Sequence, residues 1–172
     1  MTPGGRTSNC SLGVLVDFYW HACPRTADHM EAALSALWAA LQRPERRWNP
    51  WTSSMIKAEL RDRLRVAAQG GLKPVDEVKR IGEGDVLFEI RWLDLAVTDV
   101  DGKGDLLHHA TGLRLLHAEP LALSVCAVGL HAHEKPHSQD ASVVREAQDR
   151  EIDVALDRYH AGVGSLWNLR ED

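Results

Sequence analysis

The chain has 172 residues, of which 44% are hydrophobic and 26% charged, a composition that excludes wholesale disorder and fits one domain with a buried core. Its net charge of −5 at pH 7 argues against nucleic-acid binding through a general positive field, so any such binding needs a local basic patch. Three cysteines without C-x-x-C spacing argue against a disulfide framework or a cysteine-based zinc site, and they favour a cytoplasmic protein.

The N-terminal segment predicts a flexible leader over residues 1–12, because it is small, polar and rich in glycine. The apolar, β-branched and aromatic residues of 12–20 favour a first strand. Asp17 interrupts this run and no cleavage pattern follows it, so we expect neither a signal peptide nor a membrane span.

Two helices are expected next, as a hairpin. The apolar stripe from Met30 to Leu41 predicts the first, with Thr26 as its cap. Pro44 and Pro50 predict a loop over 43–53, and the second helix should run from about 54 to 69. Residues 43–67 carry a local charge of +4, and the candidate RNA-binding residues among them are Arg43, Arg46, Arg47, Lys57, Arg61 and Arg65. A solvated helix face with i,i+4 ion pairs explains the same charges equally well.

The second half of the chain predicts three strands and a last helix. After a glycine turn at 82–85, residues 86–95 alternate, with Phe88, Ile90 and Trp92 on one face. A turn at 99–105, a strand within 106–118 and a fourth strand in 121–136 follow, and then a charged helix over 139–160.

The resulting order, β-α-α-β-β-β-α, predicts an α+β fold. We expect a small, mostly antiparallel sheet of four strands, an N-terminal helical hairpin and a C-terminal helix, with the helices on one face of the sheet. The single domain should cover residues 13–165, followed by a tail at 166–172.

A polar cluster ends the fourth strand. His131, His133 and Lys135 should project from one face, since alternate side chains of a strand point the same way. The H-x-H spacing also permits metal binding, with further ligands from His108, His109, His117 and His137, and this alternative stays open.

The order of these elements, with three segments, resembles the RelE/ParE superfamily of toxins from type II toxin–antitoxin modules, most closely the HigB-type branch. The segments are LKPV and VKRI leading into LFEIR at 87–91, LRLL at 113–116, and LHAHEKP at 130–136 before a helix with Glu146, Ala147 and Arg150. The resemblance covers roughly residues 14–160.

The resemblance implies a cytoplasmic endoribonuclease that cleaves mRNA, free or on the ribosome, and that is silenced by a cognate antitoxin protein. The catalytic residues that it implies are Arg91, Arg114, His131, His133 and Lys135. Imidazole and guanidinium groups can supply the base, the acid and the cations that RNA cleavage needs, so no metal or other cofactor is expected.

Two departures from the family pattern favour an alternative. Glu134 stands where many relatives carry a second lysine, and the chain is acidic where active toxins tend to be basic. The alternative is a binding module of the same fold that does not cleave RNA and that inhibits or scaffolds a protein partner. Arg91 and Arg114 would then serve as ion-pair partners of acids such as Glu89 across the sheet.

Overall fold

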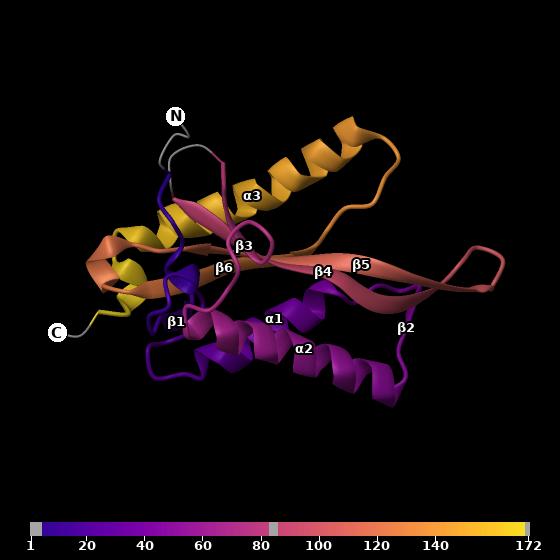
Figure 1. Ribbon diagram of the computed structural model, residues 1–172. Helices are drawn as coiled ribbons and strands as arrows, with labels where there is room; N and C mark the ends of the chain where they lie inside the picture. Colours follow the sequence, from indigo (N-terminus) through magenta and orange to yellow (C-terminus); the bar gives the residue numbers. More distant parts are fainter. Residues whose placement is uncertain (1–4, 83–85, 171–172) are drawn as a thin grey trace.

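A mixed sheet of six strands forms the middle layer of the structure, a computed structural model that describes residues 5–82 and 86–170 (Figure 1). The strand order is β1 (Asp17–Trp20), β6 (Cys126–Glu134), β5 (Leu106–Ala118), β4 (Leu87–Val100) and β2 (Arg46–Arg47), and β3 (Val78–Ile81) also pairs with β4. β1 is parallel to β6, and the other pairs are antiparallel.

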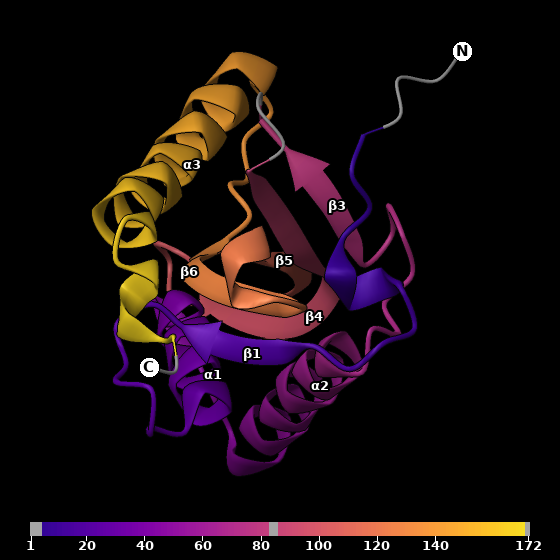
Figure 2. The ribbon, with the colours of Figure 1, turned by 90° about the vertical axis from the view of Figure 1, so that its left-hand side faces the viewer.

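Helices cover both faces of this sheet. α1 (His29–Ala40) and α2 (Pro50–Ala68) pack on one face, whereas α3 (Ala141–Val163) crosses the other (Figures 1 and 2). Three short 3₁₀ helices complete the described elements: η1 (Asn9–Ser11), η2 (Leu121–Leu123) and η3 (Leu166–Asn168). Within residues 5–82 and 86–170, no helix has the length and apolar character needed to cross a membrane.

The ends of the first two helices follow their local chemistry. Asp28 caps α1 by accepting a hydrogen bond from the Glu31 N–H, and Asn49 caps α2 in the same way through the Thr52 N–H. Pro50 takes the first helical position, where its missing N–H leaves no bond unmade. The expected Thr26 cap and the expected loop up to residue 53 are therefore wrong.

Side-chain alternation in the central strands divides the apolar residues between two cores. Phe88, Ile90 and Trp92 belong to the core beneath α1 and α2, as the alternation of β4 predicts. The opposite face carries Leu116 and Val128, which belong to a second core beneath α3. The buried residues of that second core are Leu87, Leu116, Ala118, Cys126, Val128, Leu130, Ala155, Trp167 and Leu169.

The α+β class is confirmed, but the expected arrangement within that class is wrong. The sheet has six strands and is mixed, and α3 lies on the face opposite α1 and α2. With β2 and β3, the order becomes β-α-β-α-β-β-β-β-α. The reason is that both faces of the central strands are apolar and need cover, and that strands of two and four residues are too short to show alternation.

The described parts of the expected leader and tail pack against the domain. Cys10 is fully buried in η1, although residues 1–12 were expected to be flexible, and Trp167 in the expected tail is 8% exposed. Glu119 anchors the leader by accepting hydrogen bonds from the Ser8 hydroxyl and the Asn9 N–H. Part of the glycine turn expected at 82–85 lies outside the described residues, as do residues 1–4 and 171–172.

Two leucines of β4 test this division into cores. Leu95 is fully buried, whereas Leu93 is 46% exposed. We expect Leu95→Ala to lower the free energy of unfolding by about 2–5 kcal/mol, because it leaves a cavity. The matched change Leu93→Ala should lower it by less than about 1 kcal/mol. Urea unfolding measures both, and equal losses would contradict the assigned register of β4.

Candidate active site

Three cationic or titratable side chains lie side by side on the sheet face that α3 covers. Arg91 of β4 pairs with Arg114 of β5, and Arg114 pairs with His133 of β6, so the register places the three in one line across the strands. We call Arg91, Arg114 and His133 the cationic row. The structure therefore brings together three of the five residues that the sequence proposes as catalytic.

Lys135 and His131 flank this row. The Lys135 N–H donates to the Gly112 carbonyl at 2.8 Å, and its side chain lies against Gly112, where an added Cβ would stand 3.2 Å from the Lys135 Cβ. Glycine thus permits the close approach of Lys135 to β5. His131 pairs with Leu116 on β5 and its ring stacks on that of His133, with the centroids 5.8 Å apart.

A single buried carboxylate, that of Glu89, faces three cations. Its oxygens lie 3.6 Å from the Lys79 Nζ, 3.5 Å from the Arg91 Nε and 3.7 Å from the Arg114 Nε. Three positive charges against one negative charge leave a local excess of positive charge. An ion of the opposite sign would be attracted to this excess, and guanidinium groups bind phosphate with particular strength.

Arg114 is the most deeply buried of these cations. Its side chain is 2% exposed, and burial lowers the pKa of its guanidinium, with Arg91 adding to the effect and Glu89 opposing it. Among the described residues, neither the Arg114 Nε nor the Arg91 Nε has a hydrogen-bond partner. Buried donors without partners cost free energy, so the row holds unused hydrogen-bonding capacity.

Hydrogen bonds fix different roles for the two histidines. The Nδ1 of His133 lies 3.2 Å from the Glu134 carbonyl oxygen, which can only accept, so Nδ1 carries the proton and Nε2 carries a lone pair. Burial lowers the pKa of His133, which keeps the ring neutral at pH 7. A neutral imidazole with a free lone pair on Nε2 is suited to act as a base.

The ring of His131 has the opposite arrangement. Arg158 of α3 donates to the His131 Nδ1 at 3.1 Å, so the proton resides on Nε2, which lies 2.5 Å from a Glu151 carboxylate oxygen. His21, beside this group, has its pKa lowered to about 4 by burial and by the charges of Arg158 and His131. Sequence patterns gave no signal for His21, Glu151 or Arg158, because α3 was not expected to cover this face.

The loop before β3 holds Arg91 in place. The Arg91 Nη1 donates to the Val75 carbonyl at 2.9 Å, and Arg63 of α2 donates to the Arg91 carbonyl. Val75 has a φ of 71°, a conformation that is strained for a β-branched residue. Such strain costs on the order of 1–3 kcal/mol and is often found at functional sites.

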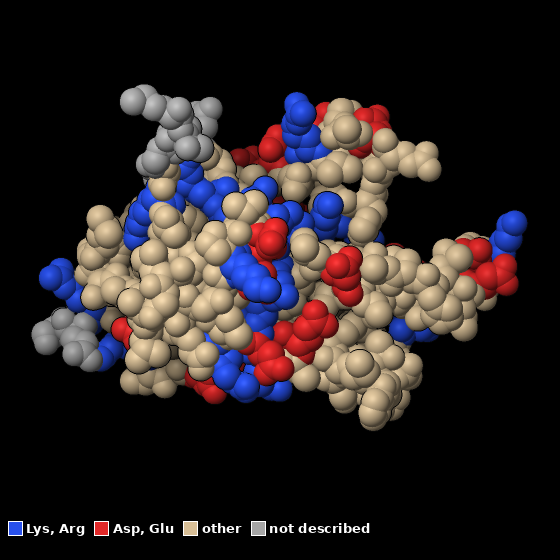
Figure 3. Space-filling view, viewed as in Figure 1, with Lys and Arg blue, Asp and Glu red and all other residues tan. Residues whose placement is uncertain are grey.

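The expected RNA-binding residues are largely engaged with other groups. Arg46 is 5% exposed and bridges Asp99 and Glu134, and Arg43 also pairs with Glu134. Among the others, Arg47 donates to the Pro44 carbonyl, Lys57 lies over the Trp38 ring, Arg61 pairs with Glu31, and Arg65 pairs with Asp62. Figure 3 shows Lys and Arg with Asp and Glu interleaved across this face. Arg46 in particular is not part of a surface patch.

Glu134 does not enter the candidate site. It pairs with Leu113, on the face opposite the cationic row, where it accepts hydrogen bonds from Arg43, Arg46 and the Thr111 hydroxyl. These donors hold the pKa of Glu134 below its ordinary value, although burial alone would raise it. The carboxylate therefore leaves the charge of the row unchanged and instead joins β6 to the loop before β2.

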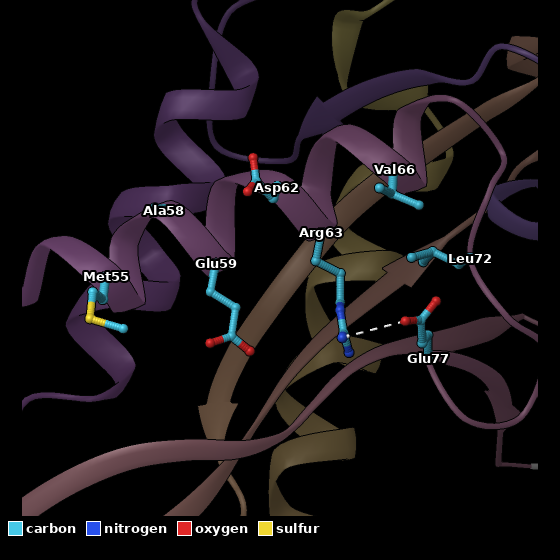
Figure 4. A pocket seen from close by; sticks show the side chains of 8 residues that line it. All are labelled: Met55, Ala58, Glu59, Asp62, Arg63, Val66, Leu72 and Glu77. Atoms are coloured by element: carbon cyan, nitrogen blue, oxygen red, sulfur yellow. Dashed lines mark ion pairs between the residues drawn. The ribbon is translucent and has the colours of Figure 1, made fainter. Parts of the chain in front are cut away.

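A hollow of about 510 Å³ lies between α2 and the loop before β3. In Figure 4, Glu59 and Arg63 project from the same side of α2, and Arg63 pairs with Glu77 at 3.4 Å. The hollow lies on the side of the sheet that carries α1 and α2, away from the face that α3 covers. It contains none of the five residues proposed as catalytic.

The alternative metal site around His131 and His133 is not formed within residues 5–82 and 86–170. Among the described residues, the three metal-type ligands that converge lie elsewhere in the fold, and they are Cys10, His117 and Glu119. Of the other histidines considered as ligands, His109 bonds to Asp99, His108 to Thr98 and His137 to Thr111.

Comparison with protein-family models, curated proteins and solved structures finds no match for this chain.

Replacement of Glu89 tests the charge balance of the site. We expect Glu89→Gln to lower the free energy of unfolding by about 3–5 kcal/mol, because it leaves buried guanidinium charge without its carboxylate. Inorganic phosphate should then raise the melting temperature of Glu89→Gln more than that of the wild type. The control is Glu146→Gln, an exposed carboxylate of α3, and equal phosphate effects in the two variants would refute an anion-binding row.

The bond between Arg46 and Asp99 predicts a pH dependence of stability. Hydrogen bonding from Arg46 lowers the pKa of Asp99 to about 2. Since this is below the ordinary value of 3.8, the stabilisation is present above about pH 4 and is lost as the pH falls toward 2. The pair should contribute about 2 kcal/mol. Urea unfolding of the wild type and Asp99→Asn should differ at pH 5 and converge only below about pH 2. A constant difference would contradict the assignment.

Proposed function

We propose that this protein is the toxin of a type II toxin–antitoxin module and a metal-independent endoribonuclease that cleaves mRNA, free or on the ribosome. The observation that carries the proposal is the cationic row beside Lys135 and His131. The guanidinium groups of Arg91 and Arg114 lie around one carboxylate and leave an excess of positive charge, which suits the binding of a phosphodiester group. A neutral histidine with an available lone pair, beside those guanidinium groups, suits proton abstraction.

The proposed reaction assigns one role to each group. The His133 Nε2 takes the proton of a ribose 2′-hydroxyl, and the 2′-oxygen attacks the adjacent phosphorus. Arg91, Arg114 and Lys135 stabilise the charge that accumulates on the phosphate oxygens. The bond to the 5′-oxygen breaks, and the Lys135 ammonium donates a proton to that oxygen. His131 stays neutral, and its ring stacks on that of His133. The products are a 2′,3′-cyclic phosphate and a 5′-hydroxyl.

The same surface gives the cognate antitoxin a target. A protein that covers the cationic row would neutralise its excess charge and exclude RNA together. An acidic antitoxin segment suits this role by charge complementarity. The interaction partners in this proposal are therefore the antitoxin and mRNA.

The burial of Arg114 and His133 favours a second candidate function. Arg114 is 2% exposed and His133 is 7% exposed, so RNA must displace covering groups before it reaches them. A module that uses this fold to bind a protein partner, without cleaving RNA, needs no such displacement. In that case Arg114 and Glu89 act as a buried ion pair of the sheet.

RNA cleavage by the purified protein tests the first proposal. In the presence of a chelator, the wild type should cleave mRNA and leave 2′,3′-cyclic phosphate ends. His133→Ala should lower the cleavage rate by about 10²–10⁴-fold, because a general base contributes an effect of this size. Melting curves of each variant separate lost chemistry from lost folding.

Lys103→Ala is the matched control, because Lys103 is an exposed cation in the turn between β4 and β5 and is not part of the row. It should cleave RNA like the wild type. Expression should arrest growth, and Arg91→Ala should relieve the arrest. Growth arrest with intact mRNA would overturn the nuclease and support the binding module, and cleavage by folded His133→Ala at the wild-type rate would refute the assigned base.

A further inference from the structure

A second polar cluster lies on the other side of β5, outside the proposed active site. Cys10 of η1 and His117 of β5 are completely buried, and Glu119, just after β5, is 2% exposed. One ligand atom from each of the three residues lies within 4.8 Å of the other two. Three metal-type ligands with almost no access to solvent are thus gathered around one point.

Both polar partners of the His117 ring approach the same one of its two nitrogens, which is unusual for a buried histidine. The Cys10 Sγ, at 3.9 Å, and the Glu119 Oε1, at 3.1 Å, both approach the same ring nitrogen, Nε2. The Nδ1 on the opposite side of the ring has no partner among the described residues. A nucleophilic triad needs the two nitrogens to face different partners, so this geometry excludes that role for Cys10.

A single ion can satisfy all three groups together. Zinc bonds of about 2.0–2.3 Å in a tetrahedral site place neighbouring ligand atoms about 3.3–3.7 Å apart. The observed separations of 3.9 Å and 3.1 Å bracket that range. Thiolate, imidazole and carboxylate are the ligand types that zinc takes in proteins.

We propose that Cys10, His117 and Glu119 form a structural binding site for a divalent zinc-type cation. A water molecule supplies the fourth position, while the Ser8 hydroxyl donates a hydrogen bond to the Glu119 Oε1 at 2.5 Å and orients that carboxylate. The cation attaches the N-terminal segment to the end of β5. Its role is independent of the proposed nuclease chemistry, which uses other residues.

The surroundings of Glu119 match those of a metal-ligating carboxylate. Its second oxygen, Oε2, accepts a hydrogen bond from the Asn9 N–H at 3.0 Å and lies 3.7 Å from the Arg6 guanidinium. Such outer contacts orient a ligand and are a regular part of metal sites. The segment from Arg6 to Cys10 thus provides both a ligand and the groups that fix another ligand.

Metal analysis of the purified protein tests this site. Protein prepared without chelators should contain about one zinc ion per chain. Cys10→Ala should contain at most a tenth of that amount. Cys126→Ala is the matched control, because Cys126 is equally buried but is not one of the three ligands, and it should retain the zinc. Zinc at about 100 times its dissociation constant should raise the melting temperature of metal-free protein by about 5–10 °C.

Cobalt substitution keeps the test decisive if Cys10→Ala does not fold. Metal-free wild-type protein titrated with Co²⁺ should develop a thiolate-to-cobalt charge-transfer band that saturates at one equivalent, and Cys126→Ala should give the same band. Absence of the band from the wild type would overturn the proposal. A zinc content that is equally low in the wild type and in Cys10→Ala would also overturn it.

Discussion

The register of β5 against its two neighbours is the constraint on which the rest of the structure depends. Arg114 meets Arg91 on one side and His133 on the other, while Leu113 and Leu115 point to the opposite face. A shift by one residue would exchange these faces, moving buried charge into the core beneath α1 and α2. The pairing therefore determines the two cores and the candidate site together.

The charges on the α3 face make this arrangement costly to change. Glu89 is the carboxylate that opposes Arg91, Arg114 and Lys79, and the Nε atoms of both arginines remain without hydrogen-bond partners in the described part of the chain. Buried arginines arranged this way contribute little net stability, and removing their partner is expensive. Their presence is easier to explain by anion binding than by packing. The strained backbone at Val75, which holds Arg91, agrees with a functional role.

Sequence patterns predicted the structure best in segments whose apolar residues follow a single repeat, either that of a strand or that of a helix. Phe88, Ile90 and Trp92 predicted both a strand and its buried face, and the apolar stripe of residues 30–41 predicted α1. They failed where a residue has two uses, as at Pro50, which ends many helices but begins α2. The face of the sheet that α3 covers was also not predicted. The apolar stripe of an amphipathic helix indicates that the helix packs on a sheet, but it does not indicate on which of two apolar faces.

The sequence by itself determined that His131, His133 and Lys135 share a face, because side chains on a strand repeat every two residues. Only the tertiary structure decided the rest: that Arg114 lies next to His133, that Glu134 turns away toward Arg46, and that Arg158 fixes the proton of His131. It also brought Cys10 to His117, 107 residues further along the chain. Local patterns report on neighbours within a few residues, whereas these contacts depend on strand pairing and on the packing of α3 and η1 across the whole chain.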